Sequence, residues 1–327
     1  MKKIHLYFRT EPSKDRFIPG DRYLRVLLKS LRRQKKPSGV EKVFLNLCKG
    51  FDELKVDYDI NLPFKKIRPG EPVVVLGNGK YALSGYHRPN PVIAGIGLMT
   101  HPNEWPGLFS EYPVAKYLQH SDWSKNMYAS VYGEDKCGLW PAGIDTEKWS
   151  PAAPVTKKYD LLIYSKIMWN KTQTDNELRS PLLKKLDAEG LSWHEITYGQ
   201  YAEQDYFELL QQCKAMIFLC EHESQGFALC EALSMNVPVL AWDQGLWLDP
   251  DRFKWGEHDP VPATSVPFFD DRCGIRFKDL KAFENALPVF WDKVKNSIFK
   301  PRDYVLENLT LKKSAQKMLD IINGVYK

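Results

Sequence analysis

The sequence repeats one pattern in both halves: a short apolar run, suited to a buried β-strand, is followed by a segment with helical spacing of apolar residues. In the first half, the apolar runs 73–76 and 92–99 end in turn-forming residues, and residues 40–54 have the spacing of an amphipathic helix. The second half is predicted to hold strands over 159–164, 193–198, 215–220 and 238–242, and helices over 178–188, 206–213 and 227–233. Strands that alternate with helices predict βαβ units and parallel sheets, so the fold class is α/β.

The length of the chain predicts two domains, because 327 residues exceed what one hydrophobic core usually serves. The polar, proline-bearing stretch 150–158 is the best linker candidate. We therefore expect an N-terminal domain over 1–150, a C-terminal domain over 151–300 and a helical segment over 301–327. Ligands of such folds bind beyond the carboxyl ends of the strands, so functional residues are expected at strand–helix junctions.

Composition narrows the classes of partner and compartment. Hydrophobic content of 43% and charged content of 27% are typical of a globular protein, and the net charge of +5 is mild. No aromatic-rich basic module of the kind that reads single-stranded nucleic acid is found, so no nucleic-acid partner is expected. The six cysteines form no C-x-x-C pair, and no apolar run is long enough for a signal peptide or a membrane span. These features favour the cytoplasm.

The stretch EHESQGFALCEALSMNVPVLAWD, residues 221–243, carries the strongest functional signal. Gly226 stands where a helix is predicted to begin. Because glycine has no side chain, the backbone N–H groups at the start of this helix could closely approach an anion such as a diphosphate. Glu231 would lie about two turns into that helix, among apolar neighbours, where a carboxylate needs a partner such as a ribose hydroxyl. Glu223, in the preceding loop, could meet the other end of the same ligand. The alternative is that both glutamates are solvated and Gly226 only makes a turn.

The segment ESQGFALCEAL resembles the signature of glycosyltransferase family 4 (group 1), in which two glutamates separated by seven residues flank a glycine-containing loop. Other motifs follow in the family's order. They are Ser38-Gly39-Val40-Glu41, Pro141-Ala142-Gly143-Ile144-Asp145-Thr146, the basic pair Lys166 and Lys171, and the C-terminal segment 301–327. The chain departs from the family at two places: it has one glycine at Gly39 instead of two, and Ser165 in place of the glycine before the first basic residue.

The resemblance implies the GT-B fold, with two Rossmann-like domains facing a cleft and the segment 301–327 crossing back to the N-terminal domain. It also implies sugar transfer from a nucleoside-diphosphate sugar to a carbohydrate or glycan acceptor, with retained anomeric configuration and no metal or other cofactor. The residues it places in catalysis are Glu223, His101, Lys166 and Lys171. Those it places at the donor are Gly39, Gln225, Gly226, Phe227 and Glu231.

Several alternatives stay open at this point. The chain could instead be a catalytically silent nucleotide-sugar binder, or another GT-B enzyme such as a nucleotide-sugar epimerase or a sugar phosphorylase. The D-x-D matches at 57–59 and 249–251 are interpreted as chance matches and not as metal sites. The basic run 22–36 is either a solvated face or a contact with anionic lipid. The aromatic region 243–273 either folds over the donor or packs as a peripheral insertion on the C-terminal domain. The oligomeric state, the donor and the acceptor are not predicted.

Overall fold

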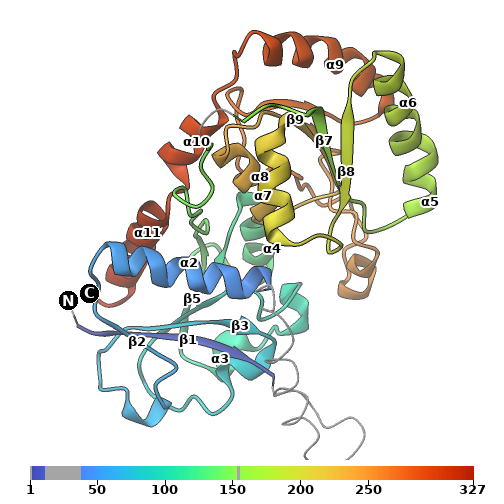
Figure 1. The fold of residues 1–327 in the computed structure, drawn as a ribbon. Helices are drawn as coiled ribbons and strands as arrows, with labels where there is room; N and C mark the ends of the chain where they lie inside the picture. Colours follow the sequence, from blue (N-terminus) through green and yellow to red (C-terminus); the bar gives the residue numbers. More distant parts are fainter. Residues whose placement is uncertain (1, 12–37, 153–154) are drawn as a thin grey trace, which may run out of the picture.

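The computed structural model describes residues 2–11, 38–152 and 155–327, and these form two α/β units (Figure 1). The basic run 22–36 lies outside the described residues. Within the described ranges, no helix combines the length and the apolar character needed to cross a bilayer. All six cysteines are buried and unpaired.

Each unit is built on one sheet whose strands all run parallel. The first sheet has six strands in the order β2 (Tyr58–Ile60), β1 (Ile4–Thr10), β3 (Val73–Asn78), β4 (Val92–Gly95), β5 (Val114–Gln119) and β6 (Cys137–Leu139). The second has five in the order β11 (Gly274–Phe277), β10 (Val239–Trp242), β9 (Cys213–Cys220), β7 (Tyr159–Lys166) and β8 (Trp193–Thr197). The expected α/β class is confirmed.

Helices cover both faces of each sheet, which explains why the strands read as continuous apolar runs. The helices are α2 (Gly39–Glu53), α3 (Leu108–Glu111), α4 (Asp122–Tyr132), α5 (Lys171–Thr174), α6 (Ser180–Ala188), α7 (Glu203–Gln212), α8 (Phe227–Ser234), α9 (Leu280–Lys295), α10 (Pro301–Asn308) and α11 (Leu311–Val325). In β3, Val73 and Val75 pack toward α3 and α4, whereas Val74 and Leu76 pack toward α2 and α11. The second sheet is covered by α7, α8 and α10 on one face and by α6 and α9 on the other.

The C-terminal helices cross from the second unit back to the first (Figure 1). Val305 of α10 lies in the core of the second unit, whereas Met318 of α11 lies in the core of the first. The contact of α11 with α2 is close, because a Cβ atom added at Gly50 would lie 2.5 Å from the carbonyl oxygen of Leu311. Core packing thus assigns α10 to the second unit and α11 to the first. The expected domain limits at 150 and 300 stay a prediction.

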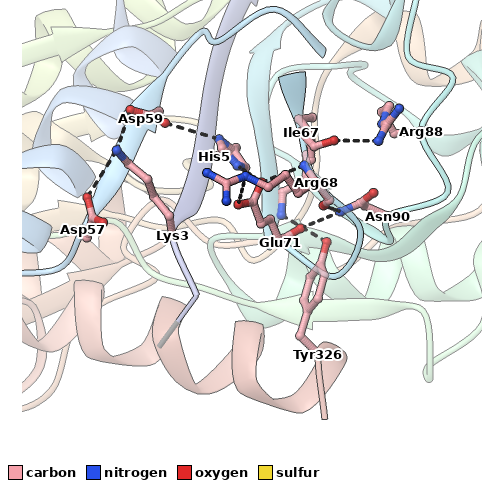
Figure 2. Close-up of polar contacts among 11 residues, drawn as sticks. Lys3, His5, Asp57, Asp59, Ile67, Arg68, Glu71, Arg88, Asn90 and Tyr326 are labelled. Carbon is pink, nitrogen blue, oxygen red and sulfur yellow. Dashed lines mark hydrogen bonds and ion pairs between the residues drawn. The ribbon is translucent and has the colours of Figure 1, made fainter. Parts of the chain in front are cut away.

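A partly buried polar cluster fixes the end of the chain against the first sheet (Figure 2). The Tyr326 hydroxyl accepts a hydrogen bond from the backbone N–H of Val73 at 3.0 Å and donates one to the Pro91 carbonyl. Nearby, His5 Nε2 lies 2.8 Å from Glu71 Oε2. These contacts lie where the parallel strands begin. The Tyr326 bonds thus hold the C-terminal end of α11 at the edge of the sheet opposite to the carboxyl ends of the strands, where such folds bind ligands.

Neither D-x-D match forms a cluster of metal ligands. Asp57 and Asp59 pair with Lys3 at 3.5 and 3.0 Å, in the cluster of Figure 2. Asp249 accepts a hydrogen bond from the backbone of Asp251 and begins the 3₁₀ helix η5 (Pro250–Trp255). Among the described residues, no three His, Cys, Asp or Glu side chains are grouped as metal ligands would be.

The segment 243–265, between β10 and β11, leaves the second unit and packs on the first. Trp247 and Ala263 belong to the hydrophobic core of the first unit. The Trp255 carbonyl accepts a hydrogen bond from Asn103 Nδ2 at 2.6 Å. The structure therefore excludes a peripheral insertion packed on the second unit alone. We call this segment the bridging insertion.

Candidate functional site

A cleft lies between the two units, where the strands of both sheets end. Its first lobe has a volume of about 370 Å³. The lobe is lined by residues at or after the ends of β4, β5, β7, β8 and β9 and by the N-terminal parts of α2, α7 and α8. These residues include Ser38, Gly39, Lys42, Ile96, His120, Lys166, Tyr198, Tyr201, Glu203, Glu223, Ser224, Gln225, Gly226, Phe227 and Glu231. β7 and β9 are neighbours at the point where the connections of the second sheet change direction, which is where open α/β sheets bind ligands.

The start of α8 is exposed to this lobe and needs its glycine. Gly226 precedes the helix with φ 67° and ψ 57°, a left-handed conformation that side chains rarely adopt. The first backbone N–H groups of α8 have no partner within the helix, and the helix dipole favours negative charge at this point. The predicted position of Gly226 at the start of a helix is confirmed, and the geometry suits an anionic group.

Glu223 and Lys166 form an ion pair in the middle of the cleft. Lys166 Nζ lies 2.6 Å from Glu223 Oε1 and 4.7 Å from the centre of the Tyr198 ring. Burial lowers the pKa of Lys166, but the charge of Glu223 outweighs this effect and leaves the pKa above its usual range. The lysine is therefore fully charged at neutral pH.

The loop that carries Glu223 is held from both sides of the cleft. The backbone N–H of Glu223 donates to the Thr264 carbonyl at 2.9 Å. Its carbonyl accepts a hydrogen bond from Trp123 Nε1 of α4, in the first unit, at 2.8 Å. These contacts fix the carboxylate in place relative to both units.

Glu231 is buried in the second unit and pairs with Lys42, which reaches across the cleft from α2. Burial raises the pKa of Glu231 to about 7, although the charge of Lys42 opposes this rise. Lys42 also lies 2.9 Å from Glu203 and 5.3 Å from the centres of the Phe227 and Trp149 rings. Burial lowers the pKa of Lys42, but the two carboxylates outweigh it and keep the pKa above its ordinary value.

The other predicted donor residues lie around the same lobe but differ in what their side chains can do. Gly39 begins α2 after a capping box between Ser38 and Glu41, and it faces the lobe. Phe227 lines the lobe with its half-buried ring. The Gln225 amide, by contrast, accepts from the backbone N–H of Ala142 at 2.8 Å and donates to its carbonyl at 3.2 Å. Its side chain thus bonds the backbone of the other unit, at Ala142, through both amide atoms.

Two predicted catalytic residues are not brought to the wall of the cleft. Lys171 is exposed at the start of α5 and lines neither lobe. His101 is fully buried under the bridging insertion, with Nε2 3.0 Å from Glu257 Oε1 and its ring stacked on Trp247 and Trp255 at 5.8 and 5.4 Å. Burial lowers the pKa of His101, so the ring is predominantly neutral at neutral pH.

A second lobe of about 420 Å³ adjoins the first and shares Lys166 and Glu223 with it. A further hollow of about 720 Å³ lies near Phe269 to Arg276, where β11 begins. That hollow is at the wrong end of the parallel strands for a ligand site of this fold, so we place the candidate site in the two-lobed cleft.

The residues that sequence reasoning missed are Lys42, Glu203 and the side chains of the second lobe. Lys42 stands three positions after Gly39, so helical periodicity alone puts both on one face of α2. No comparable sequence signal predicts that Lys42 pairs with Glu231, because the two residues are 189 positions apart.

Three solved structures have a similar fold at low sequence identity. AviGT4, a glycosyltransferase involved in avilamycin A biosynthesis, matches with a TM-score of 0.54 and 11% identity over 100% of this chain and 98% of its own. Sucrose-phosphate synthase from Thermosynechococcus elongatus matches with 0.53 and 12% over 100% and 99%. The pneumococcal O-GlcNAc transferase GtfA, in complex with UDP and GlcNAc, matches with 0.51 and 12% over 86% and 60%.

The chain has the GT-B fold. This GT-B protein has two parallel sheets and a cleft at the carboxyl ends of their strands. Its C-terminal helix returns to the first domain. No family model matches the sequence, and no curated protein sequence is significantly similar to it. The likeness at 11–12% identity establishes the fold alone.

Proposed function

We propose that this GT-B protein is a retaining glycosyltransferase of the family 4 type, which moves a sugar from a nucleoside-diphosphate sugar to a carbohydrate or glycan acceptor. One observation carries the proposal: Glu223 and Glu231 both line one interdomain lobe, with the start of α8 between them. A ligand with an anion in its middle and hydroxyl groups at both ends fits this arrangement, and a nucleotide sugar has that pattern.

The charges of the lobe suit the departure of a diphosphate. When the bond between the sugar and the diphosphate breaks, its electron pair stays on the phosphate oxygen, and the negative charge there increases. Lys166 and the first N–H groups of α8 are placed to stabilise that charge. Glu223 would hold hydroxyl groups of the donor sugar, and Glu231 those of the ribose. Retention and independence of metal rest on the resemblance of the sequence, whereas the expected cytoplasmic location rests on the unpaired cysteines.

The proposal is tested by thermal shift and by turnover. A nucleoside diphosphate or nucleotide sugar at a hundred times its dissociation constant should stabilise the protein by about 2.7 kcal/mol. The shift should become smaller in Glu223→Gln for nucleotide sugars but stay unchanged for the free nucleoside diphosphate, since Glu223 is assigned to the sugar. If no nucleotide of a broad panel shifts the melting temperature, the proposal fails.

A second candidate function, a catalytically silent nucleotide-sugar binder, is favoured by the placement of Lys171 and His101 outside the cleft. It predicts the same thermal shift without release of nucleoside diphosphate from the donor. Incubation with the stabilising nucleotide sugar and a panel of glycosides as acceptors, with and without EDTA, separates the two. Release of nucleoside diphosphate supports an enzyme, and release in EDTA supports one that needs no metal. NMR of the glycoside product then reports whether the anomeric configuration is retained.

A further inference from the structure

The second lobe begins where the first ends, at Lys166 and Glu223, and continues away from Glu231. Its walls come from both units: the ends of β4 and β5 and the start of α4 on one side, and the loops after β7 and β9 on the other. The bridging insertion adds Trp247 and Asp249. A ligand in this lobe would thus lie next to the sugar end of a donor bound in the first lobe.

Three tryptophan rings line this lobe and pack around one imidazole. His222 stacks on Trp169 with ring centres 5.2 Å apart and planes 12° apart. Trp123 and Trp247 meet the imidazole edge to face at 5.6 and 6.4 Å. Trp169 is further fixed by Glu221, whose carboxylate accepts its backbone N–H at 3.1 Å. Trp169 is half-buried, so part of its surface stays open to the lobe.

The charge of the lobe excludes a phosphate-rich ligand. Lys166 is the only lysine or arginine among the described residues that line it, and Glu223 already pairs with that lysine. Burial, together with the nearby charge of Lys166, lowers the pKa of His222 to about 4, so the imidazole is neutral at neutral pH. An amide, a hydroxyl and a carboxylate line the lobe beside the indole rings, at Gln119, Thr100 and Asp249. Glu221 and Ser124 also line it, but their side chains already bond to the backbone of Met168 and of Ser121.

We infer that the second lobe binds a neutral pyranose ring of the acceptor, with its apolar face on Trp169 and its hydroxyl groups toward the polar side chains opposite. A pyranose has one apolar face and a rim of hydroxyl groups, which matches an indole wall next to uncharged and acidic hydrogen-bonding groups. The bridging insertion completes this site, and His101 is a positioning residue that supports Trp247 by stacking. The inference rests on the proposed function, because the first lobe must hold the donor.

Saturation-transfer NMR with a panel of neutral methyl pyranosides at millimolar concentration tests the inference on the whole chain. At least one glycoside should receive saturation, and Trp169→Ala should weaken its binding roughly ten-fold. Trp169→Phe should retain binding, since it keeps an aromatic face. Trp291→Ala, a half-buried tryptophan on α9 outside the cleft, is the matched control and should bind the glycoside like the wild type.

The thermal shift with nucleoside diphosphates is measured on the same variants and should be unchanged in all of them. If nucleotides bind but no neutral glycoside does, or if glycoside binding survives Trp169→Ala, the second lobe is not a pyranose site and the inference falls alone. Preferential binding of glucose 6-phosphate over every neutral glycoside would also overturn it. If no nucleotide binds, the proposed function fails instead.

Discussion

Lys42, in the first domain, places its ammonium group on the carboxylate of Glu231, which is buried in the second domain. The pair closes the cleft at the end where the ribose of a donor is expected. Removal of either partner would be costly, because it leaves the other group without its partner in a buried place. The contact therefore links the ionisation of one residue to the stability of the two-domain structure.

The first prediction concerns the pH dependence of stability. Burial raises the pKa of Glu231 from an ordinary 4.5 to about 7, so the folded chain holds this proton more tightly than the unfolded chain does. The stabilising contribution is complete below pH 4.5 and is lost as the pH rises to 7. Relative to Glu231→Gln, the wild type should lose unfolding free energy across this window, by at most about 1.4 kcal/mol per pH unit.

Chemical denaturation at a series of pH values measures this difference. Glu208→Gln, at an exposed position on α7, is the control and should give a curve parallel to the wild type. In Lys42→Met the carboxylate loses its cation, so the decline should extend above pH 7. Parallel curves for the wild type and Glu231→Gln would mean that Glu231 ionises in the folded state at its ordinary pKa.

The second prediction separates the two lysines that the sequence placed at the diphosphate. Lys166→Ala should lower the rate of nucleoside-diphosphate release from the donor by about 100-fold, because it removes a preorganised charge from the leaving group. Lys171→Ala should leave the rate within the error of the wild type, since Lys171 is exposed outside both lobes. An equal loss in the two variants would show that the start of α5 moves onto the bound ligand.

The sequence predicted most elements of the fold because parallel strands buried on both faces read as apolar runs, as in β3 and β9. It gave no clear signal for β2 and β6, which have three residues each and are only partly buried. The glutamates around Gly226 were predictable because one strand, one loop and one helix place them. The burial of His101 was not predictable, because the bridging insertion that covers it follows more than a hundred residues later in the chain.

The third prediction compares two glycines of α2. Gly50→Ala should destabilise the protein in spite of the better helix propensity of alanine, because its Cβ would lie 2.5 Å from the Leu311 carbonyl oxygen. At Gly39 no atom of the described chain lies within 4 Å of an added Cβ, so Gly39→Ala should melt like the wild type. Because Gly39 lines the first lobe, the same change should weaken nucleotide-sugar binding. Normal binding by Gly39→Ala would place the ligand away from the start of α2.

The last prediction concerns Gln225, whose buried amide joins the loop before α8 to the backbone of Ala142. Gln225→Ala removes both hydrogen bonds and leaves the backbone N–H and carbonyl of Ala142 unpaired in a buried place, so unfolding free energy should fall by about 2 kcal/mol. Gln204→Ala, at an exposed position on α7, is the control and should change stability little. Thermal melts measure stability, and a nucleotide titration at low temperature measures affinity. If Gln225→Ala were as stable as the wild type but no longer bound nucleotide, the Gln225 side chain would contact the ligand and would not stabilise the contact between the domains.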